Sequence, residues 1–261
     1  MTEPIPQMLD VGSGAARRRI ACLSQHGSGD GPGLLWLQGF KSDMVSTKAA
    51  ALAEWAEARG LSLTRFDYSG HGQSSGLFEE GTLGHWIEEA RAVFEQLTQG
   101  PQIVIGSSMG GAIALVLLKR LLAEAPDVAA RIKALVLIAP AWDMTEELMW
   151  KEFPEAVRRE IMEKGSWMRP SQYGEPYPVT RGLIEDGRRH LIGRLRWNPG
   201  RPIVILHGRL DPDVPFAHSE DLIGNIDGGL VRLVEVPDGE HRLSRPEDIA
   251  LLFQLIDIVR G

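Results

Sequence analysis

The sequence predicts an α/β protein with a mainly parallel sheet of about eight strands and helices on both faces of that sheet. Short apolar runs alternate with amphipathic segments through most of the 261 residues. A turn rich in small residues also joins a strand to a helix at residues 106–111. The alternation stops at residues 144–198, where the pattern is helical and turn-rich with no convincing strand. We therefore expect a core formed by residues 1–143 and 199–261, and a short helical cap or lid inserted at residues 144–198.

The expected elements follow one another along the chain. Apolar or alternating runs predict strands at residues 18–23, 34–37, 61–66, 102–105, 134–138, 203–206 and 230–236. The run at 34–37 is wholly apolar, which is typical of a strand covered on both faces. Helical spacing of apolar residues predicts helices at residues 47–59, 82–97, 216–226 and 247–259. A further helix is predicted from the small-residue turn to about residue 122.

The composition limits the partners and the compartment. The formal net charge is −7 at pH 7, which argues against binding to nucleic acid or to an anionic membrane surface. The single cysteine, Cys22, excludes an intramolecular disulfide and fits a reducing compartment. We find no secretory signal pattern and no uncharged apolar run long enough to span a bilayer. These observations predict a cytoplasmic protein without stable membrane insertion.

The turn at residues 106–110 reads Gly-Ser-Ser-Met-Gly and fits the pattern Gly-x-Ser-x-Gly, with Ser108 at its centre. In this pattern a sharp strand-to-helix turn lifts the serine off the end of the strand. Both glycines are needed because a side chain there would collide with the neighbouring strand or helix. The helix that follows directs its first N–H groups to the place where negative charge develops. The pattern predicts that Ser108 is a nucleophile.

A nucleophilic serine needs a base within hydrogen-bond reach and an acid that orients the base. Two later segments supply them in the order serine, acid, histidine, each directly after a predicted strand. Residues 207–215 contain Asp211 and Asp213, and either could lie at the strand end. We favour Asp211 as the acid because Asp213 looks like the residue that starts the next helical segment. Residues 237–243 contain His241, the predicted base.

Acyl transfer also needs donors for the oxyanion of the tetrahedral intermediate. One should be the backbone N–H of Met109, the residue after the nucleophile. The other is expected to be the N–H of Phe40, in the loop after residues 34–37, where Gly39 lets the backbone come close.

The other polar residues give weaker signals. No group of His, Cys, Asp or Glu has convincing metal-ligand spacing, and we find no phosphate-binding loop or dinucleotide fingerprint. We therefore expect no metal and no cofactor. His71 is expected to brace the turn behind the nucleophile, and His207 to be a structural residue at a strand end.

The combination of residues 106–111 with Asp211 and His241 resembles the α/β-hydrolase superfamily over nearly the whole chain. Residues 39–44, 65–72, 81–82 and Trp86 are similar in particular to the mitochondrial acyl-protein thioesterases of mammals, also known as mycophenolic acid acyl-glucuronide esterases. The resemblance implies an α/β-hydrolase fold and a serine esterase or thioesterase. It implies the same roles for Ser108, Asp211, His241, Phe40 and Met109. We recognise no mitochondrial transit segment, so we do not expect the organelle to be shared.

The cap is rich in methionine and aromatic residues, which suit an adaptable acyl or aryl pocket. Most of them are expected to pack the cap onto the core, since apolar helical stripes are usually core. We expect a few of them to line the substrate pocket, with Met144, Met149, Trp150 and Trp167 as the candidates. The cap also contains Tyr173 and Tyr177.

The predicted function is cofactor-free hydrolysis of carboxylic esters or thioesters, on a small molecule or an acylated protein, through an acyl-enzyme on Ser108. Two alternatives stay open. The same triad serves C–C bond hydrolases and lactonases, and a ligand-binding relative can retain the fold without turnover. The sequence predicts neither the acyl chain length, nor the leaving group, nor the oligomeric state.

Overall fold

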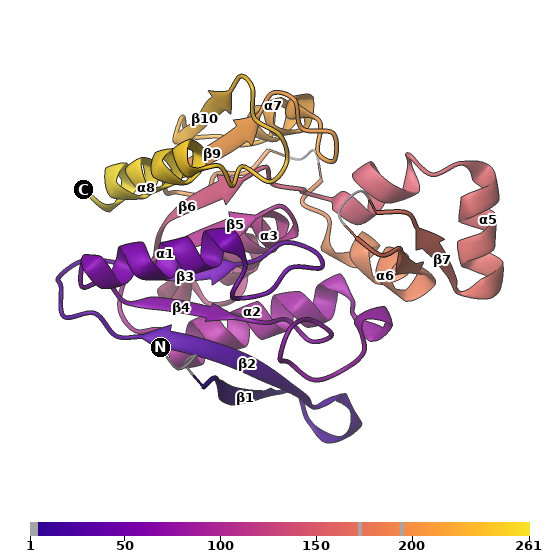
Figure 1. The fold of residues 1–261 in the computed structure, drawn as a ribbon, viewed down its shortest axis with the longest axis horizontal. Helices are drawn as coiled ribbons and strands as arrows, with labels where there is room; N and C mark the ends of the chain where they lie inside the picture. The colour runs from indigo at the N-terminus through magenta and orange to yellow at the C-terminus, as the bar shows by residue number, and fades with distance from the viewer. Residues whose placement is uncertain (1–4, 172–173, 194–195) are drawn as a thin grey trace.

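The centre of the molecule is an eight-stranded sheet with the strand order β1-β2-β4-β3-β5-β6-β9-β10 (Figure 1). The computed structural model describes residues 5–171, 174–193 and 196–261. β2 pairs antiparallel with β1 and with β4, and all other neighbours pair parallel. The strands are β1 (Gln7–Val11), β2 (Arg18–Gln25), β3 (Gly33–Leu37), β4 (Leu63–Phe66), β5 (Gln102–Ser107), β6 (Ile132–Ile138), β9 (Ile203–Gly208) and β10 (Val231–Val236). The predicted fold class is confirmed.

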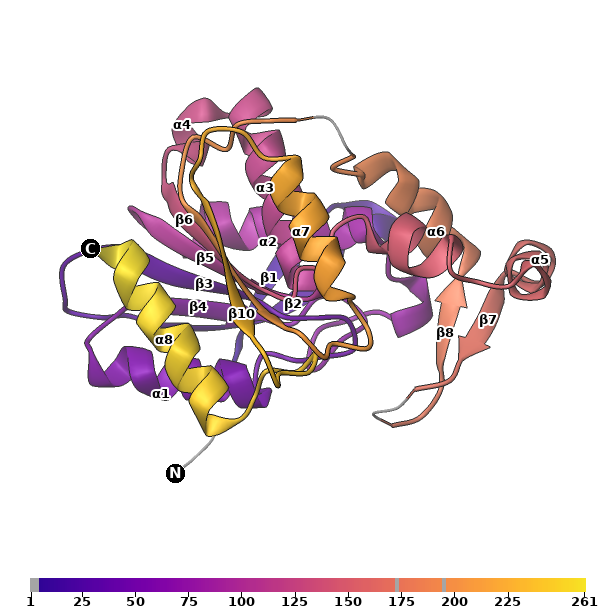
Figure 2. The ribbon, with the colours of Figure 1, turned by 90° about the horizontal axis from the view of Figure 1, so that it is seen from above.

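Helices cover both faces of the sheet, and its central strands are therefore buried on both sides. Every residue of β3, β5 and β9 is buried. One face is covered by α1 (Thr47–Ala58) and α8 (Pro246–Arg260), and the other by α2 (Leu83–Leu97), α3 (Met109–Glu124) and α7 (Phe216–Gly224) (Figure 2). Short helical turns complete the core, namely η1 (Gly14–Ala16), η2 (Phe78–Glu80) and α4 (Pro126–Ala129).

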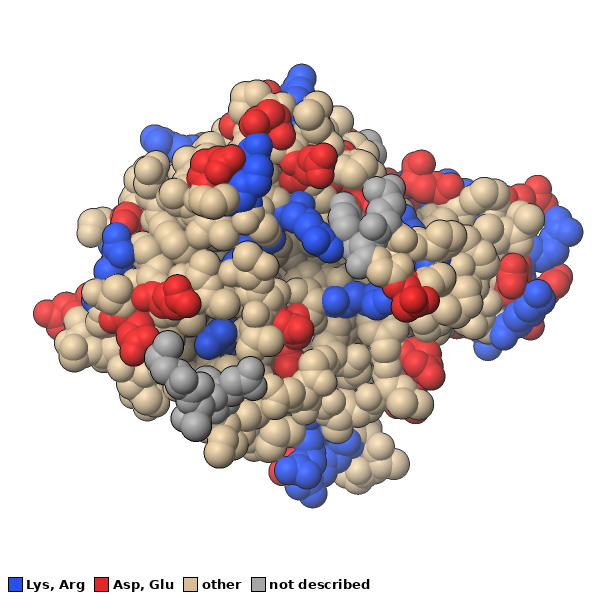
Figure 3. Space-filling view, in the orientation of Figure 1, with Lys and Arg blue, Asp and Glu red and all other residues tan. Residues whose placement is uncertain are grey.

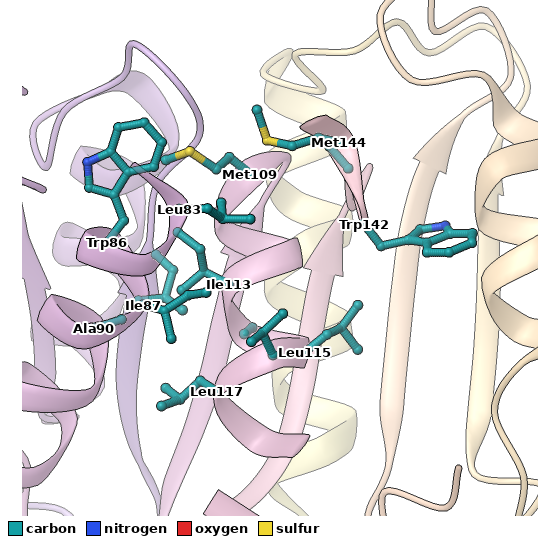
Figure 4. Packing of buried hydrophobic residues seen from close by; sticks show 14 of the residues in the cluster. Leu83, Trp86, Ile87, Ala90, Met109, Ile113, Leu115, Leu117, Trp142 and Met144 are labelled. Carbon is teal, nitrogen blue, oxygen red and sulfur yellow. The ribbon is translucent and has the colours of Figure 1, made fainter. Parts of the chain in front are cut away.

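The packing of α2 against α3 fixes the helix that follows the small-residue turn. Leu83 and Ile87 of α2 face Ile113 of α3 in the buried cluster between the two helices (Figure 4). Each of these side chains is at most 2% exposed, and burying one such side chain stabilises the fold by about 1.5–3 kcal/mol. The N-terminus of α3 is therefore held on a well-packed support.

The segment between β6 and β9 lies to one side of the sheet (Figures 1 and 2). Its elements are η3 (Thr145–Trp150), α5 (Glu155–Lys164), β7 (Ser166–Arg169), β8 (Tyr177–Thr180), α6 (Arg181–Gly187) and η4 (Arg188–His190). β7 and β8 form an antiparallel pair, so the prediction that this segment contains no strand is wrong. Each strand has only four residues, which is the shortest run in which an alternating pattern can be recognised.

The edge strand β1 was not among the predicted strands. Only Val11 of its five residues is buried, so β1 has no apolar run that would distinguish it from a loop. Among the described helices, none combines the length and the apolar character needed to cross a bilayer.

Candidate active site

The turn between β5 and α3 places Ser108 at the carboxyl end of a central strand. Ser108 has φ 54° and ψ −115°, a strained conformation for a residue with a side chain. Its N–H donates a 2.8 Å hydrogen bond to the carbonyl of Ile138 in β6. A Cβ atom on Gly110 would lie 2.0 Å from the carbonyl oxygen of Leu37, and one on Gly106 would lie 2.4 Å from that of Gly110. The sharp turn therefore requires both glycines.

Three side chains from distant parts of the chain meet at this turn. His241 Nε2 lies 3.1 Å from Ser108 Oγ, and His241 Nδ1 lies 2.7 Å from Asp211 Oδ2. Asp211 follows β9 and His241 follows β10. These two strands come after β6 in the strand order, at one end of the sheet. Because parallel strands end at one edge of the sheet, these loops converge on Ser108. The structure thus joins the serine, the histidine and Asp211 in one hydrogen-bonded chain.

The carboxylate of Asp211 is buried and held on both oxygens. Oδ1 accepts hydrogen bonds from the backbone N–H groups of Asp213 and Val214, at 2.9 and 2.8 Å. Burial raises the pKa of Asp211, but hydrogen bonds from His207 and His241 and the positive charge of His241 outweigh burial and hold this pKa below its usual range. An ionised Asp211 fixes the proton of His241 on Nδ1, which leaves the Nε2 lone pair free to accept the Ser108 proton.

The rival acid, Asp213, contacts Asp211 through its backbone N–H. Within the described residues, Asp211, Asp213 and His241 form the one group whose potential metal-ligand atoms lie close together, within 4.8 Å of one another. Asp211 and His241 are already hydrogen-bonded to each other, so the hydrogen bonds of the triad account for the proximity of these groups.

The loop after β3 lies against the nucleophile turn and carries Phe40. A Cβ atom on Gly39 would be 3.3 Å from the carbonyl oxygen of Ser107 and 3.4 Å from Cβ of Ser108, which measures how close the two backbones are. On the other side, Met109 is the first residue of α3, where the helix itself offers no acceptor for the backbone N–H. The two backbone segments predicted to bind the oxyanion therefore adjoin Ser108.

Two side chains from the loop after β4 hold the loop that carries Phe40. The N–H of Lys41 donates to His71 Nε2 at 3.2 Å, and the N–H of Met44 donates to Asp67 Oδ1 at 2.7 Å. Lys41 itself has φ 57°, so these bonds stabilise a strained backbone. His71 thus contacts this loop rather than the turn behind the nucleophile. Asp67 was not among the predicted site residues, although it lies in the motif that carries the resemblance.

The four predicted pocket residues of the cap lie in different surroundings. Met144 and Met149 are buried in the cluster that includes residues of α2 and α3. Trp150 and Trp167 are partly buried. The ring of Trp167 packs against Phe153 at 5.3 Å, and that of Trp150 lies under Arg188 at 4.8 Å. These ring contacts lie within the segment between β6 and β9, and both tryptophans also pack against the same buried cluster. Tyr173 lies outside the described residues.

Tyr177 of β8, in the segment between β6 and β9, contacts the loop next to Ser108. Its ring packs edge-on against Phe40, with 5.5 Å between centroids. The ammonium of Lys41 lies 5.0 Å from the same ring and donates a 3.3 Å hydrogen bond to the carbonyl of Glu175. The β7–β8 pair is thus docked onto the loop that carries Phe40. This contact was not predicted, because the β7–β8 pair that carries Tyr177 was not predicted either.

Comparisons of the sequence with known families and proteins agree with this geometry. The sequence profile of the family described as "Serine aminopeptidase, S33" matches residues 37–182. The protein named "Palmitoyl-protein thioesterase ABHD10, mitochondrial" of Homo sapiens is 33% identical over 231 residues, which cover 88% of this chain and 73% of that protein.

Solved structures share the whole fold. A "Putative hydrolase from Agrobacterium vitis S4" has a TM-score of 0.94 and 40% identity, over 99% of this chain and 100% of that chain. "Alpha/beta hydrolase domain-containing protein 10 from mouse" has a TM-score of 0.83 and 29% identity, over 97% of this chain and 98% of that chain. The chain therefore belongs to the α/β-hydrolase superfamily of serine hydrolases, in the family described as serine aminopeptidase S33, and is of its esterase and thioesterase type.

Proposed function

We propose that the chain hydrolyses carboxylic esters or thioesters through an acyl-enzyme on Ser108. One observation carries the proposal: Ser108, His241 and Asp211 form an unbroken hydrogen-bonded chain, with distances of 3.1 and 2.7 Å. A positioned base and an orienting acid are what a serine hydroxyl needs to become a nucleophile at neutral pH.

In this mechanism Ser108 Oγ attacks the carbonyl carbon of the substrate while His241 Nε2 accepts the serine proton. The backbone N–H groups of Phe40 and Met109 bind the oxyanion of the tetrahedral intermediate. His241 then returns the proton to the leaving alkoxide or thiolate, and the acyl group remains on Ser108. Water activated by His241 attacks the acyl-enzyme and releases the carboxylic acid.

We propose fatty acyl thioesters, with a small molecule or a protein as the leaving group, as the preferred substrates. The proposal is supported by the human relative, which is named a palmitoyl-protein thioesterase. It is also supported by the aromatic side chains around the loop next to Ser108, where Phe40 packs on Phe78 and Tyr177. Aromatic surroundings of this kind suit an alkyl chain better than a charged group.

We propose that residues 144–198 act as a cap on a core formed by residues 1–143 and 199–261. The proposal is supported by the position of these elements between β6 and β9 and to one side of the sheet (Figure 1). It is also supported by the contact of Tyr177 with Phe40, through which the cap adjoins the reacting centre.

The partners and location proposed for the chain follow from charge and cysteine usage. On the face seen in Figure 3, acidic and basic side chains are interspersed, and the net charge is −7, so we expect no nucleic-acid partner. We propose a cytoplasmic location, which the cysteine count supports, because a single cysteine forms no intramolecular disulfide and fits a reducing compartment. Mitochondrial import of the full chain fused to a fluorescent protein would overturn this location, since the human relative is named mitochondrial.

Hydrolysis of matched oxygen esters and thioesters, from acetyl to palmitoyl, tests the proposed function. Turnover that rises with acyl length and is higher for thioesters supports it, provided that Ser108→Ala is inactive. A wild-type protein that hydrolyses neither series contradicts it. Cleavage confined to cyclic esters or to C–C bonds would instead favour the lactonase or C–C hydrolase alternative, which the named relatives do not support.

A further inference from the structure

A second histidine contacts the acid of the triad from inside the protein. His207 lies in β9 and is fully buried. Its Nε2 lies 3.2 Å from Asp211 Oδ2 and 3.0 Å from the carbonyl oxygen of Val214. Its Nδ1 lies 2.7 Å from the hydroxyl of Ser219 in α7, and Ser219 is also fully buried. Both nitrogens of a ring that water does not reach are therefore engaged.

The partners of His207 determine where its proton lies. A backbone carbonyl and an ionised carboxylate can only accept hydrogen bonds. Nε2 must therefore carry a proton, which it donates to the Val214 carbonyl while the same nitrogen faces Asp211 Oδ2 at 3.2 Å. The Ser219 hydroxyl can donate to Nδ1, and with that bond the ring is satisfied as a neutral imidazole.

This proton completes the set of donors around the Asp211 carboxylate. Oδ2 accepts from His241 and lies 3.2 Å from the protonated Nε2 of His207, while Oδ1 accepts from two backbone N–H groups. Val214 closes the arrangement, because its N–H binds Oδ1 and its carbonyl accepts from His207. Removing His207 would leave Oδ2 with His241 alone, so that the carboxylate, still bound through Oδ1 to its two backbone donors, is held less firmly toward His241.

We infer that His207, oriented by Ser219, is a positioning residue for the reaction: it holds Asp211 Oδ2 toward His241. The inference rests on the proposed function, since it requires Asp211 to be the acid of the triad. The series of side-chain contacts Ser219–His207–Asp211–His241–Ser108 then extends the triad into the core as far as α7.

Two substitutions of His207 form a matched pair that separates this role from simple packing. The amide nitrogen of glutamine can reach the place of Nε2, whereas that of asparagine reaches only the place of Nδ1. His207→Gln therefore keeps a donor for Asp211, and His207→Asn loses it, while both leave a neutral amide in the same buried site. Steady-state kinetics are measured on one chromogenic ester at a temperature below the unfolding midpoints of both variants.

We expect His207→Asn to lower kcat by about tenfold or more with KM unchanged within about twofold, because a misplaced catalytic group costs rate rather than binding. His207→Gln should stay within about threefold of wild type. Equal kcat values for the two variants, or a loss confined to KM, would overturn the inference. If His207→Asn does not fold, Ser219→Ala replaces it. A loss of kcat in Ser219→Ala that is smaller than the loss of about tenfold expected for His207→Asn supports the inference, and an unchanged kcat overturns it.

Asp211→Asn is measured alongside to test the proposed function separately. If Asp211→Asn is as active as wild type, Asp211 is not the acid and the proposed function fails at that residue, whatever the His207 variants show. If Asp211→Asn is inactive while the two His207 variants behave alike, the triad stands and only the role of His207 is refuted.

Discussion

The backbone N–H of Lys41 donates a hydrogen bond to Nε2 of His71, at 3.2 Å, and so ties the loop carrying Phe40 to the loop after β4. His71 Nδ1 lies 3.1 Å from the carbonyl oxygen of Ser69, which requires the ring proton on Nδ1 and leaves Nε2 as the acceptor. Burial also lowers the pKa of His71. The neutral ring is therefore the form that supports the loop.

His71→Ala should lower kcat by about 10- to 100-fold with little change in KM, because the N–H of Phe40 would lose its fixed direction toward the oxyanion. His71→Gln can present its carbonyl oxygen to Lys41 and should retain more of the activity. Steady-state kinetics on both variants check this. Equal activity of the alanine and glutamine variants would show that the hydrogen bond does not matter.

The two aspartates after β9 should differ sharply in their effect on catalysis. Asp211→Asn should lower kcat by about 10⁴-fold, because the wrong tautomer of His241 would then face Ser108. Asp213→Asn keeps the backbone N–H that binds Asp211 and should remain within about fivefold of wild type. Measuring kcat of the two variants on one ester shows which aspartate is the acid of the triad. The reverse order of activities would make Asp213 the acid.

Lys48 predicts a pH dependence of stability. Its ammonium bonds to the carbonyl of Arg242, the residue after His241, and lies 3.3 Å from Ser244 Oγ. Burial, with the nearby charge of Arg242, lowers the pKa of Lys48 from 10.5 to about 8, against an opposing effect of Asp248. Between these two values the unfolded chain keeps a proton that the folded chain has lost, so the free energy of unfolding rises with pH.

Urea unfolding at about pH 7.5 and 9.5 should therefore show a gain of order 1–3 kcal/mol in wild type that Lys48→Met lacks. Lys151→Met serves as the control, because the Lys151 side chain is 52% exposed. It should follow the wild-type pH dependence. If Lys48→Met shows the same pH dependence as wild type, the lowered pKa of Lys48 is not the cause of that dependence.

Gly110→Ala should destabilise the protein by about 3 kcal/mol or more, since the added Cβ would meet the Leu37 carbonyl oxygen at 2.0 Å. Gly224→Ala is the control, because a Cβ atom there meets nothing within 4 Å. We expect it to stay within about 1 kcal/mol of wild type. Comparing the urea unfolding of both variants checks the prediction, and similar losses in the two would contradict it.

The sequence predicted the parts of the fold that local patterns encode. Central strands such as β3 are uniform apolar runs, and the glycines around Ser108 mark the sharp turn. The strands before Asp211 and His241 imply that their loops meet at one edge of a parallel sheet, so the order of the three residues along the chain was informative.

Features that depend on tertiary contacts were not accessible in this way. The edge strand β1 exposes most of its residues, and β7 and β8 have four residues each, so neither gives a clear period. The contact of Tyr177 with Phe40 depends on that undetected pair. His207 precedes Asp211 by only four residues, yet its partner Ser219 comes from the following helix.

The most direct test of the central claim is covalent labelling with a fluorophosphonate, followed by peptide mass spectrometry of the full-length protein. We predict a single modified residue, Ser108, with no labelling of Ser108→Ala and slow labelling of His241→Ala. Modification of a different residue, or labelling that persists in Ser108→Ala, would contradict the assignment of the nucleophile and the acyl-enzyme mechanism built on it.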